Sequence, residues 1–221
     1  MNNAIVLFAP PPLLGQAGTE LLDHFPADKC LLLFHRYIEE SVAYFSHHDS
    51  DFWLTCTELH QEMLLLQSFP TVAGIQVANG DMTKRLTDLT NYFLNYKEYQ
   101  SVTFFLQSFT FLFTATQAKL AQAFRRTSRS VALLTDNDSD QLAAISVSFP
   151  FSELYQDIVW EKESLAQQIK SHCKDSDIPC RIIDSNALLI SNPQIINGEL
   201  QEQIQSNYPR LGKQLQGKPN L

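Results

Sequence analysis

The sequence lacks any long apolar run and any N-terminal export signal. No stretch reaches the roughly 18 consecutive apolar residues that a membrane-spanning helix needs. The first residues, MNNAIVLF, contain neither a basic segment nor the small-residue cleavage site of a signal peptide. We therefore expect a cytoplasmic protein without a membrane span, whose chain opens on a β-strand.

Basic residues are also scarce. The chain has 16 Lys and Arg against 24 Asp and Glu, which gives a formal net charge of −8. Binding to nucleic-acid phosphates requires clustered Lys and Arg. The only basic cluster is small and consists of Arg125, Arg126 and Arg129. The charge balance therefore argues against a nucleic-acid partner.

Cysteine and histidine form no recognisable catalytic or metal-binding motif. The four cysteines lack metal-site spacing, and no H-E-x-x-H, Ser-His-Asp or Cys-His arrangement can be identified. In a chain without an export signal, we expect reduced and partly buried cysteines. Cys173 and Cys180 flank a predicted helix end and strand start, where a redox pair is the alternative to a structural role. Residues 47–51, HHDSD, contain ligand types, but we expect a solvated loop there.

Alternating strand and helix patterns fill most of the 221 residues. Strands are predicted at residues 4–9, 51–58, 72–76, 101–107, 131–135, 142–147 and 179–183. Helices are predicted at residues 27–46, 59–67, 82–96, 116–126 and 161–173. This alternation predicts an α/β fold with a mostly parallel sheet flanked by helices on both faces. We expect one domain over residues 1–196 and a partly helical, loosely docked C-terminal tail over residues 197–221.

Ligands of parallel α/β sheets bind at the carboxyl ends of the strands. This rule selects the loops after residues 9, 107 and 135 as candidate sites. The first loop lies in FAPPPLLGQAGTEL, residues 8–21, which has the strand, glycine loop and helix layout of a phosphate-binding loop. Such loops usually carry a basic side chain, but this one contains no lysine or arginine.

Three short motifs occur in a recognisable order: FAPPPLLGQAGTEL, GDMTKRL at residues 80–86, and LYQDIVW at residues 154–160. Over residues 4–196 the chain resembles a bacterial glycosyltransferase-like family, the radical-SAM/selenodomain-associated transferases. That family has a small GT-A-type nucleotide-diphospho-sugar transferase fold. The resemblance implies ligand-binding roles for five residues that match the family motifs: Gly15, Thr19, Gly80, Asp81 and Arg85.

The chain departs from this family where the family carries charge. Pro10, Gly18 and Glu20 occupy the three positions of the family's basic residues in the first motif. Phe109 replaces the Asp of a G-S-D-x-P motif, which looks like a metal ligand in the family. A late acidic motif of the family falls on residues 189–196, LISNPQII, which contain no acidic residue.

These departures predict a degenerate diphosphate and metal site. A charge-assisted hydrogen bond contributes roughly 1.5–3 kcal/mol, so losing three of them would remove roughly 5–9 kcal/mol. Diphosphate affinity would then fall at least roughly a thousandfold. Phe109 cannot ligate a metal ion, and Glu20 would repel a phosphate. We therefore expect no certain cofactor, and the missing charges argue against a nucleotide-sugar ligand.

Several residues keep an alternative open. Asp138 and Asp140 lie in TDNDSDQ, which is either a polar turn or a cation site. Asp81 and Arg85 lie four apart at a helix start, where they form either an ion pair with Asp81 as N-cap or a contact with nucleotide or acceptor. The stretch FFLQSFTFLF, residues 104–113, either fills the core or forms an apolar plug or partner surface.

Two functions from different classes follow. The first is a non-catalytic glycosyltransferase-like protein that keeps the fold and serves as a binding or assembly subunit, as a homodimer or beside another protein partner. The second is an active, divergent transferase that uses a nucleotide-linked or other activated donor. In that second case Asp81, Arg85, Asp138 and Asp140 would be recruited, together with Mg²⁺ or Mn²⁺.

Overall fold

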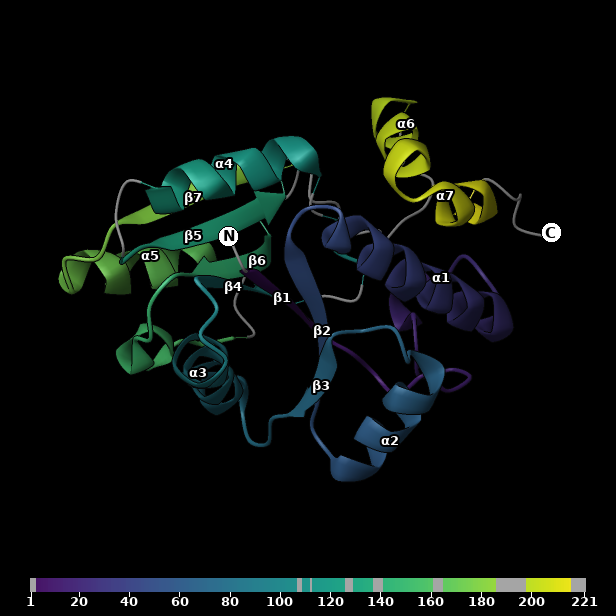
Figure 1. Ribbon diagram of the computed structural model, residues 1–221, viewed down its shortest axis with the longest axis horizontal. Coiled ribbons are helices and arrows are strands. Elements are labelled where there is room, and N and C mark those ends of the chain that lie inside the picture. Colours follow the sequence, from purple (N-terminus) through teal and green to yellow (C-terminus); the bar gives the residue numbers. More distant parts are fainter. Residues whose placement is uncertain are drawn as a thin grey trace.

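The computed structural model describes residues 3–106, 109–111, 113–125, 129–136, 141–160, 165–185 and 198–215. Its strands form one sheet in the order β3-β2-β1-β4-β6-β5-β7 (Figure 1). These strands are β1 (Asn3–Phe8), β2 (Ser50–Cys56), β3 (Gly74–Val77), β4 (Ser101–Phe105), β5 (Val131–Asp136), β6 (Leu142–Val147) and β7 (Cys180–Ser185). Within the described sheet, β6 is antiparallel to β4 and β5, whereas the other neighbours are parallel. The predicted mostly parallel sheet is confirmed.

Helices cover both faces of the sheet, as the sequence predicts. The α-helices are α1 (Ala27–Ser46), α2 (Leu59–Ser68), α3 (Met82–Asn91), α4 (Thr114–Arg125), α5 (Leu165–Asp175), α6 (Gly198–Asn207) and α7 (Pro209–Leu215). The shorter helical segments are η1 (Thr19–Leu21), η2 (Tyr92–Tyr96) and η3 (Ser152–Tyr155). One core lies between the sheet and α1, α2, α4, α6 and α7, and the other lies between the sheet and α3, η2, η3 and α5. Figure 1 shows α1 and α2 on one side of β1–β3 and α3 on the other.

Side-chain alternation along β1 explains the two cores. Ile5 and Leu7 point into the first core, whereas Ala4 and Val6 point into the second. Because both faces of this strand are covered, it is apolar at every buried position. Among the described residues, no helix has both the length and the apolarity needed to cross a bilayer.

The apolar stripe predicted over residues 82–96 breaks near its end. Leu86, Leu89 and Phe93 are buried, but Tyr96 is 76% exposed. The α-helical pattern places Tyr96 on the buried face, and this prediction is wrong. The chain switches to a π-helical turn at Tyr92, which rotates the following residues, and Tyr96 stacks on Tyr92 with ring centroids 5.7 Å apart.

The described part of the C-terminal tail makes buried contacts with the domain. Tyr208 and Leu211 are fully buried and belong to the core that α1 faces. The Glu40 carboxylate of α1 accepts hydrogen bonds from the backbone N–H groups of Arg210 at 2.8 Å and Leu211 at 2.9 Å. These N–H groups begin α7 and have no partner inside their own helix, so Glu40 caps it. The boundary between residues 1–196 and 197–221 stays a prediction.

We expect Glu40→Ala to lower the free energy of unfolding by about 1–3 kcal/mol, because it removes a carboxylate that pairs with two backbone donors. Glu39→Ala is the matched control, since Glu39 is exposed and pairs with Arg36 at the surface. This control should cost less than about 1 kcal/mol. Urea denaturation of the two variants and the parent compares the values, and equal losses would contradict the capping role of Glu40.

Candidate functional site

The carboxyl ends of β1, β2, β3 and β4 share one edge of the sheet, because these strands are parallel. This edge brings together the loop after Phe8, the end of β2 at Cys56, the turn before α3 and the loop after β4. Five of the predicted candidates, Gly15, Thr19, Gly80, Asp81 and Arg85, lie on these segments. Asp138 and Asp140, the predicted cation ligands, lie outside the described residues.

The loop after β1 folds onto itself. The backbone N–H groups of Gln16 and Ala17 donate to the carbonyl of Leu13, at 3.0 and 3.2 Å. A three-residue 3-10 turn, η1, follows the loop, and α1 begins only at Ala27. A turn this short provides little of the dipole that stabilises a phosphate at a helix N-terminus. The layout therefore differs from the strand, loop and helix that the sequence predicts for residues 8–21.

Gly18 is required by close packing. Its φ is +66°, and an added Cβ would lie 2.9 Å from the carbonyl oxygen of Cys30 in α1. The position is buried, and it is one of the three places where the resembled family has a basic residue. A long side chain at Gly18 would therefore displace α1. Of the other two places, Pro10 and Glu20 are half-buried.

The Gly80-Asp81 pair begins α3. Gly80 has a φ of +105°, which favours glycine. The Asp81 side chain accepts a hydrogen bond from the Lys84 N–H at 2.8 Å, so Asp81 is the N-cap of the helix. The predicted capping role is confirmed. The ion pair predicted between Asp81 and Arg85 is absent from the described residues, whereas Lys84 pairs with Asp88.

The Asp81 side chain accepts a hydrogen bond, whereas the Arg85 side chain forms no ion pair with a carboxylate among the described residues. Its guanidinium lies over the Phe8 ring, 4.5 Å from the centroid, at the end of β1. Its Nε is buried without a hydrogen-bond partner among the described residues. Burial lowers the pKa of Arg85 from its ordinary value, and nearby Cys56 opposes this effect. A half-buried cation at this edge is suited to an anionic ligand.

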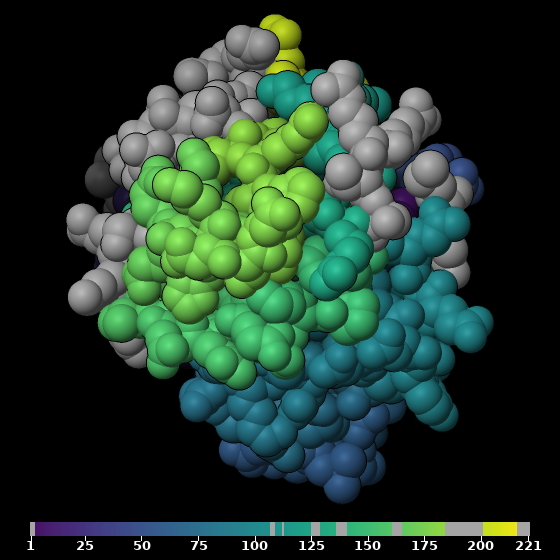
Figure 2. All heavy atoms as spheres, turned by 90° about the vertical axis from the view of Figure 1, so that its left-hand side faces the viewer, coloured from purple at the N-terminus to yellow at the C-terminus, as the bar shows by residue number. Residues whose placement is uncertain are grey.

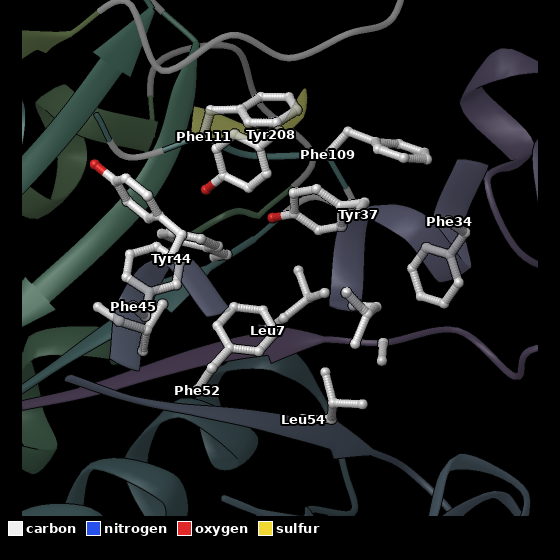
Figure 3. Close-up of a cluster of buried hydrophobic side chains, with 14 of the residues drawn as sticks. Leu7, Phe34, Tyr37, Tyr44, Phe45, Phe52, Leu54, Phe109, Phe111 and Tyr208 are labelled. Atoms are coloured by element: carbon white, nitrogen blue, oxygen red, sulfur yellow. The ribbon is translucent and has the colours of Figure 1, made fainter. Parts of the chain in front are cut away.

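The loop after β4 turns its aromatic side chains into the core. Phe109 is 2% exposed and contacts Phe34 and Tyr37 of α1, with ring centroids 6.2 and 5.3 Å away (Figure 3). Phe111 is fully buried against Tyr37 and Tyr208. Of the two alternatives for residues 104–113, the structure favours core filling, because an interaction surface would have to be exposed.

The described residues of this edge do not fit the divalent cation of the resembled family. No three His, Cys, Asp or Glu side chains of the described residues gather where they could hold a metal ion. Phe109, which the family resemblance aligns with an acidic ligand, is buried and points into the core.

The LYQDIVW segment supports α3, a role that its sequence did not reveal. The Trp160 Nε1–H donates to Thr83 Oγ1 at 2.9 Å, and the Thr83 hydroxyl donates to the Tyr155 carbonyl at 3.0 Å. Figure 2 shows the green segment that contains η3 and α5 lying against the teal segment that contains α3. Thr83 is two residues from Arg85, so this network fixes the helix turn that carries the guanidinium.

The predicted cysteine pair is brought together by the fold. Cys173 is buried in α5, Cys180 begins β7, and neither forms a disulfide. The hydrogen bond with Cys180 and burial both raise the pKa of the Cys173 thiol. The same hydrogen bond lowers the pKa of Cys180, which is only half-buried. Since a lowered thiol pKa favours reactivity and a raised one opposes it, the choice between a structural role and a redox pair stays a prediction.

The arrangement of strands and helices is that of the nucleotide-diphospho-sugar transferase and nucleotidyltransferase fold. A crystal structure of a protein assigned as a nucleotide-diphospho-sugar transferase, from Desulfovibrio desulfuricans G20, is similar with a TM-score of 0.72 and 13% identity, over 96% of this chain and 97% of that chain. The 4-diphosphocytidyl-2C-methyl-D-erythritol synthase of Anaerococcus prevotii DSM 20548 is similar with a TM-score of 0.54 and 10% identity, over 98% of both chains.

The sequence matches no protein-family model and no curated protein. At identities of 13% and 10%, the structural likeness shows the fold alone. The fold that the family resemblance implies is confirmed. Membership of the radical-SAM/selenodomain-associated transferases, and the ligand-binding roles taken from them, stay predictions.

We expect Gly18→Ala to destabilise the protein more than Gly15→Ala. Both positions have positive φ, +66° and +74°, so alanine costs about 1–2 kcal/mol at each. At Gly18 the new methyl group also meets the Cys30 carbonyl, whereas nothing lies within 4 Å at Gly15. Thermal unfolding of the two variants measures the difference. Equal transition temperatures would mean that Gly18 does not fix the loop against α1.

Proposed function

We propose that this protein is a non-catalytic member of the nucleotide-diphospho-sugar transferase fold that serves as a binding or assembly subunit. The observation that carries the proposal is the burial of Phe109, which is 2% exposed and packs on α1. A loop that presents its side chains to the core cannot also present a metal ligand to a diphosphate. The charge that stabilises a departing nucleotide is then missing from this loop.

The loop after β1 supports the same proposal. Three of its N–H groups, those of Leu13, Gln16 and Ala17, donate within the loop, and Gly18 leaves no room for the basic side chain of the resembled family. Glu20 adds a negative charge on η1. In their described residues, two loops on neighbouring strands therefore offer no basic side chain or metal ligand to a diphosphate.

An exposed apolar stripe on α2 supports association with a partner. Leu59, Met63 and Leu66 are 70%, 62% and 47% exposed, and their spacing places them on one face of the helix. Leu65, on the other face, is fully buried. Side chains of this size contribute to binding when a second molecule removes them from water. A second copy of this chain is the partner that we propose.

Arg85 favours the second candidate function, a divergent transferase with a nucleotide-linked or other activated donor. Its half-buried guanidinium lies at the carboxyl edge without a carboxylate partner in the described structure. In that function Arg85 would bind a donor phosphate, and Mg²⁺ or Mn²⁺ would require Asp81, Asp138 and Asp140. The N-cap role of Asp81 weakens this candidate, because its Oδ1 already accepts the Lys84 N–H.

Thermal unfolding with UDP-, GDP- and CDP-sugars, each with and without Mg²⁺ or Mn²⁺, separates the two functions. We expect no metal-dependent rise in transition temperature, because a ligand that does not bind the native state cannot stabilise it. A metal-dependent rise that Arg85→Gln abolishes, but Lys84→Gln retains, would overturn the non-catalytic function and support the transferase. Lys84 is the matched control because it carries the same charge on the same helix and is exposed.

Light scattering after size-exclusion chromatography tests the partner surface. We expect the parent chain to form a dimer and Met63→Lys to dissociate it, because a charge in an apolar contact must be desolvated. Gln122→Lys is the control, since Gln122 is an exposed polar residue of α4, away from the α2 face. A parent chain that is monomeric at about 100 µM would contradict self-association through α2, because a chain that is mostly dimeric at this concentration must have a dimer Kd well below it.

A further inference from the structure

A cavity of about 420 Å³ lies at the edge of the sheet opposite the candidate site. Its floor is formed by the amino ends of β1 and β4 and the carboxyl end of β6, and α4 forms its roof. In Figure 1, α4 runs across the sheet close to the N-terminal end of the chain. The volume falls in the range of small-molecule pockets, which is about 300–1,000 Å³.

The floor of this cavity is polar where a sheet covered by a helix is ordinarily apolar. In the sheet, Asn3 of β1 lies beside Ser101 of β4. One row deeper, Thr103 of β4 lies between Ile5 of β1 and Ser146 of β6. The hydroxyl-bearing residues Ser101, Thr103 and Ser146 are 6%, 3% and 0% exposed. The next row consists of apolar residues: Leu7, Phe105 and Ala144. Polarity therefore rises along the sheet toward the cavity.

These hydroxyls are organised in pairs. The Ser101 hydroxyl donates to Asn3 Oδ1 at 2.8 Å, and the Thr103 and Ser146 hydroxyls lie 2.8 Å apart. In the second pair, the hydroxyl that accepts still has its own hydrogen, and both oxygens keep a lone pair. The pairs are thus preorganised, and Ser101 and Thr103, which keep a little exposed surface, retain lone pairs for a ligand, whereas Ser146 is fully buried. Gln117 of α4 adds an amide from the roof.

The cavity lining is uncharged. No Asp, Glu, Lys or Arg lines it among the described residues, and His48 is the one titratable side chain there. An ionic ligand would have to lose its hydration without a countercharge, which costs several kcal/mol. The remaining lining is apolar and includes Ile5, Leu120 and Phe124. Hydroxyls and amides facing an apolar wall complement a small ring that carries hydroxyl groups on its edge and C–H groups on its face.

We infer that this cavity binds one uncharged, hydroxyl-rich ring of monosaccharide size, such as a neutral sugar or a cyclitol. The Ser101 and Thr103 hydroxyls recognise the ring hydroxyls, the buried Ser146 hydroxyl orients Thr103, and Phe124 packs against the C–H face. The site is separate from the carboxyl edge, and its occupancy does not depend on the proposed non-catalytic function.

Ligand-detected NMR and isothermal titration with glucose, galactose, mannose, N-acetylglucosamine and myo-inositol test this inference. Glucose 1-phosphate and glucuronate are the charged counterparts. We expect at least one neutral ring to bind with a Kd below about 10 mM and both anions to bind at least tenfold more weakly than that ring, because an ion loses its hydration in this uncharged cavity. Absence of binding by every neutral ring, or tighter binding of the anions, would overturn the inference.

Two α4 variants locate the binding. Ala121 lines the cavity, so Ala121→Leu should fill part of it and weaken binding at least tenfold. Ala118→Leu is the matched control, because Ala118 is exposed on the same helix and its variant should bind like the parent. Thr103→Val provides a second test, since it removes one hydroxyl at constant shape. Retention of full affinity in both Ala121→Leu and Thr103→Val would place the ligand elsewhere and overturn the assignment.

Discussion

Tyr37 holds the first core together by joining three segments that are far apart in the chain. Its hydroxyl donates to the Thr110 carbonyl at 2.6 Å, and its ring contacts Phe109, Phe111 and Tyr208 (Figure 3). Burial raises the pKa of this hydroxyl, so it remains a donor across the pH range in which proteins are stable. One side chain of α1 thereby fixes both the loop after β4 and the start of α7.

This constraint decides what the carboxyl edge of the sheet can do. A loop bound to the core at Phe109, Thr110 and Phe111 has a fixed shape and offers a carbonyl to Tyr37 rather than a carboxylate to a ligand. The neighbouring loop after β1 is fixed in the same way by Gly18 against α1. The described residues of both loops pack against α1, whereas the half-buried guanidinium of Arg85 on α3 lies over Phe8 at this edge.

The sequence predicts the elements well because their signals are local. The apolar spacing of α1, the buried run of β1 and the capping pair Gly80-Asp81 each depend on residues within a few positions of one another. Other features of the structure leave no mark in the spacing of side chains. Glu40 meets Arg210 and Leu211 across about 170 positions, and no local pattern signals that contact. The exposure of Tyr96 depends on one π-helical turn, which side-chain spacing does not reveal.

Ligands of such sheets are expected at the carboxyl edge, which should therefore carry the polar side chains. In this protein the polar side chains of the first core lie at the amino edge instead. Apolar side chains such as Phe105 and Phe109 fill the first core toward the carboxyl edge, whereas hydroxyls line its amino edge beneath α4. A methyl group in place of the Thr103 hydroxyl would bury more apolar surface, at about 25 cal/mol per Å². The hydroxyl rows therefore contribute less to stability than an apolar floor would. Polar groups that lower stability and converge on a cavity are typical of binding sites, so the amino edge is the better built of the two for an uncharged ligand.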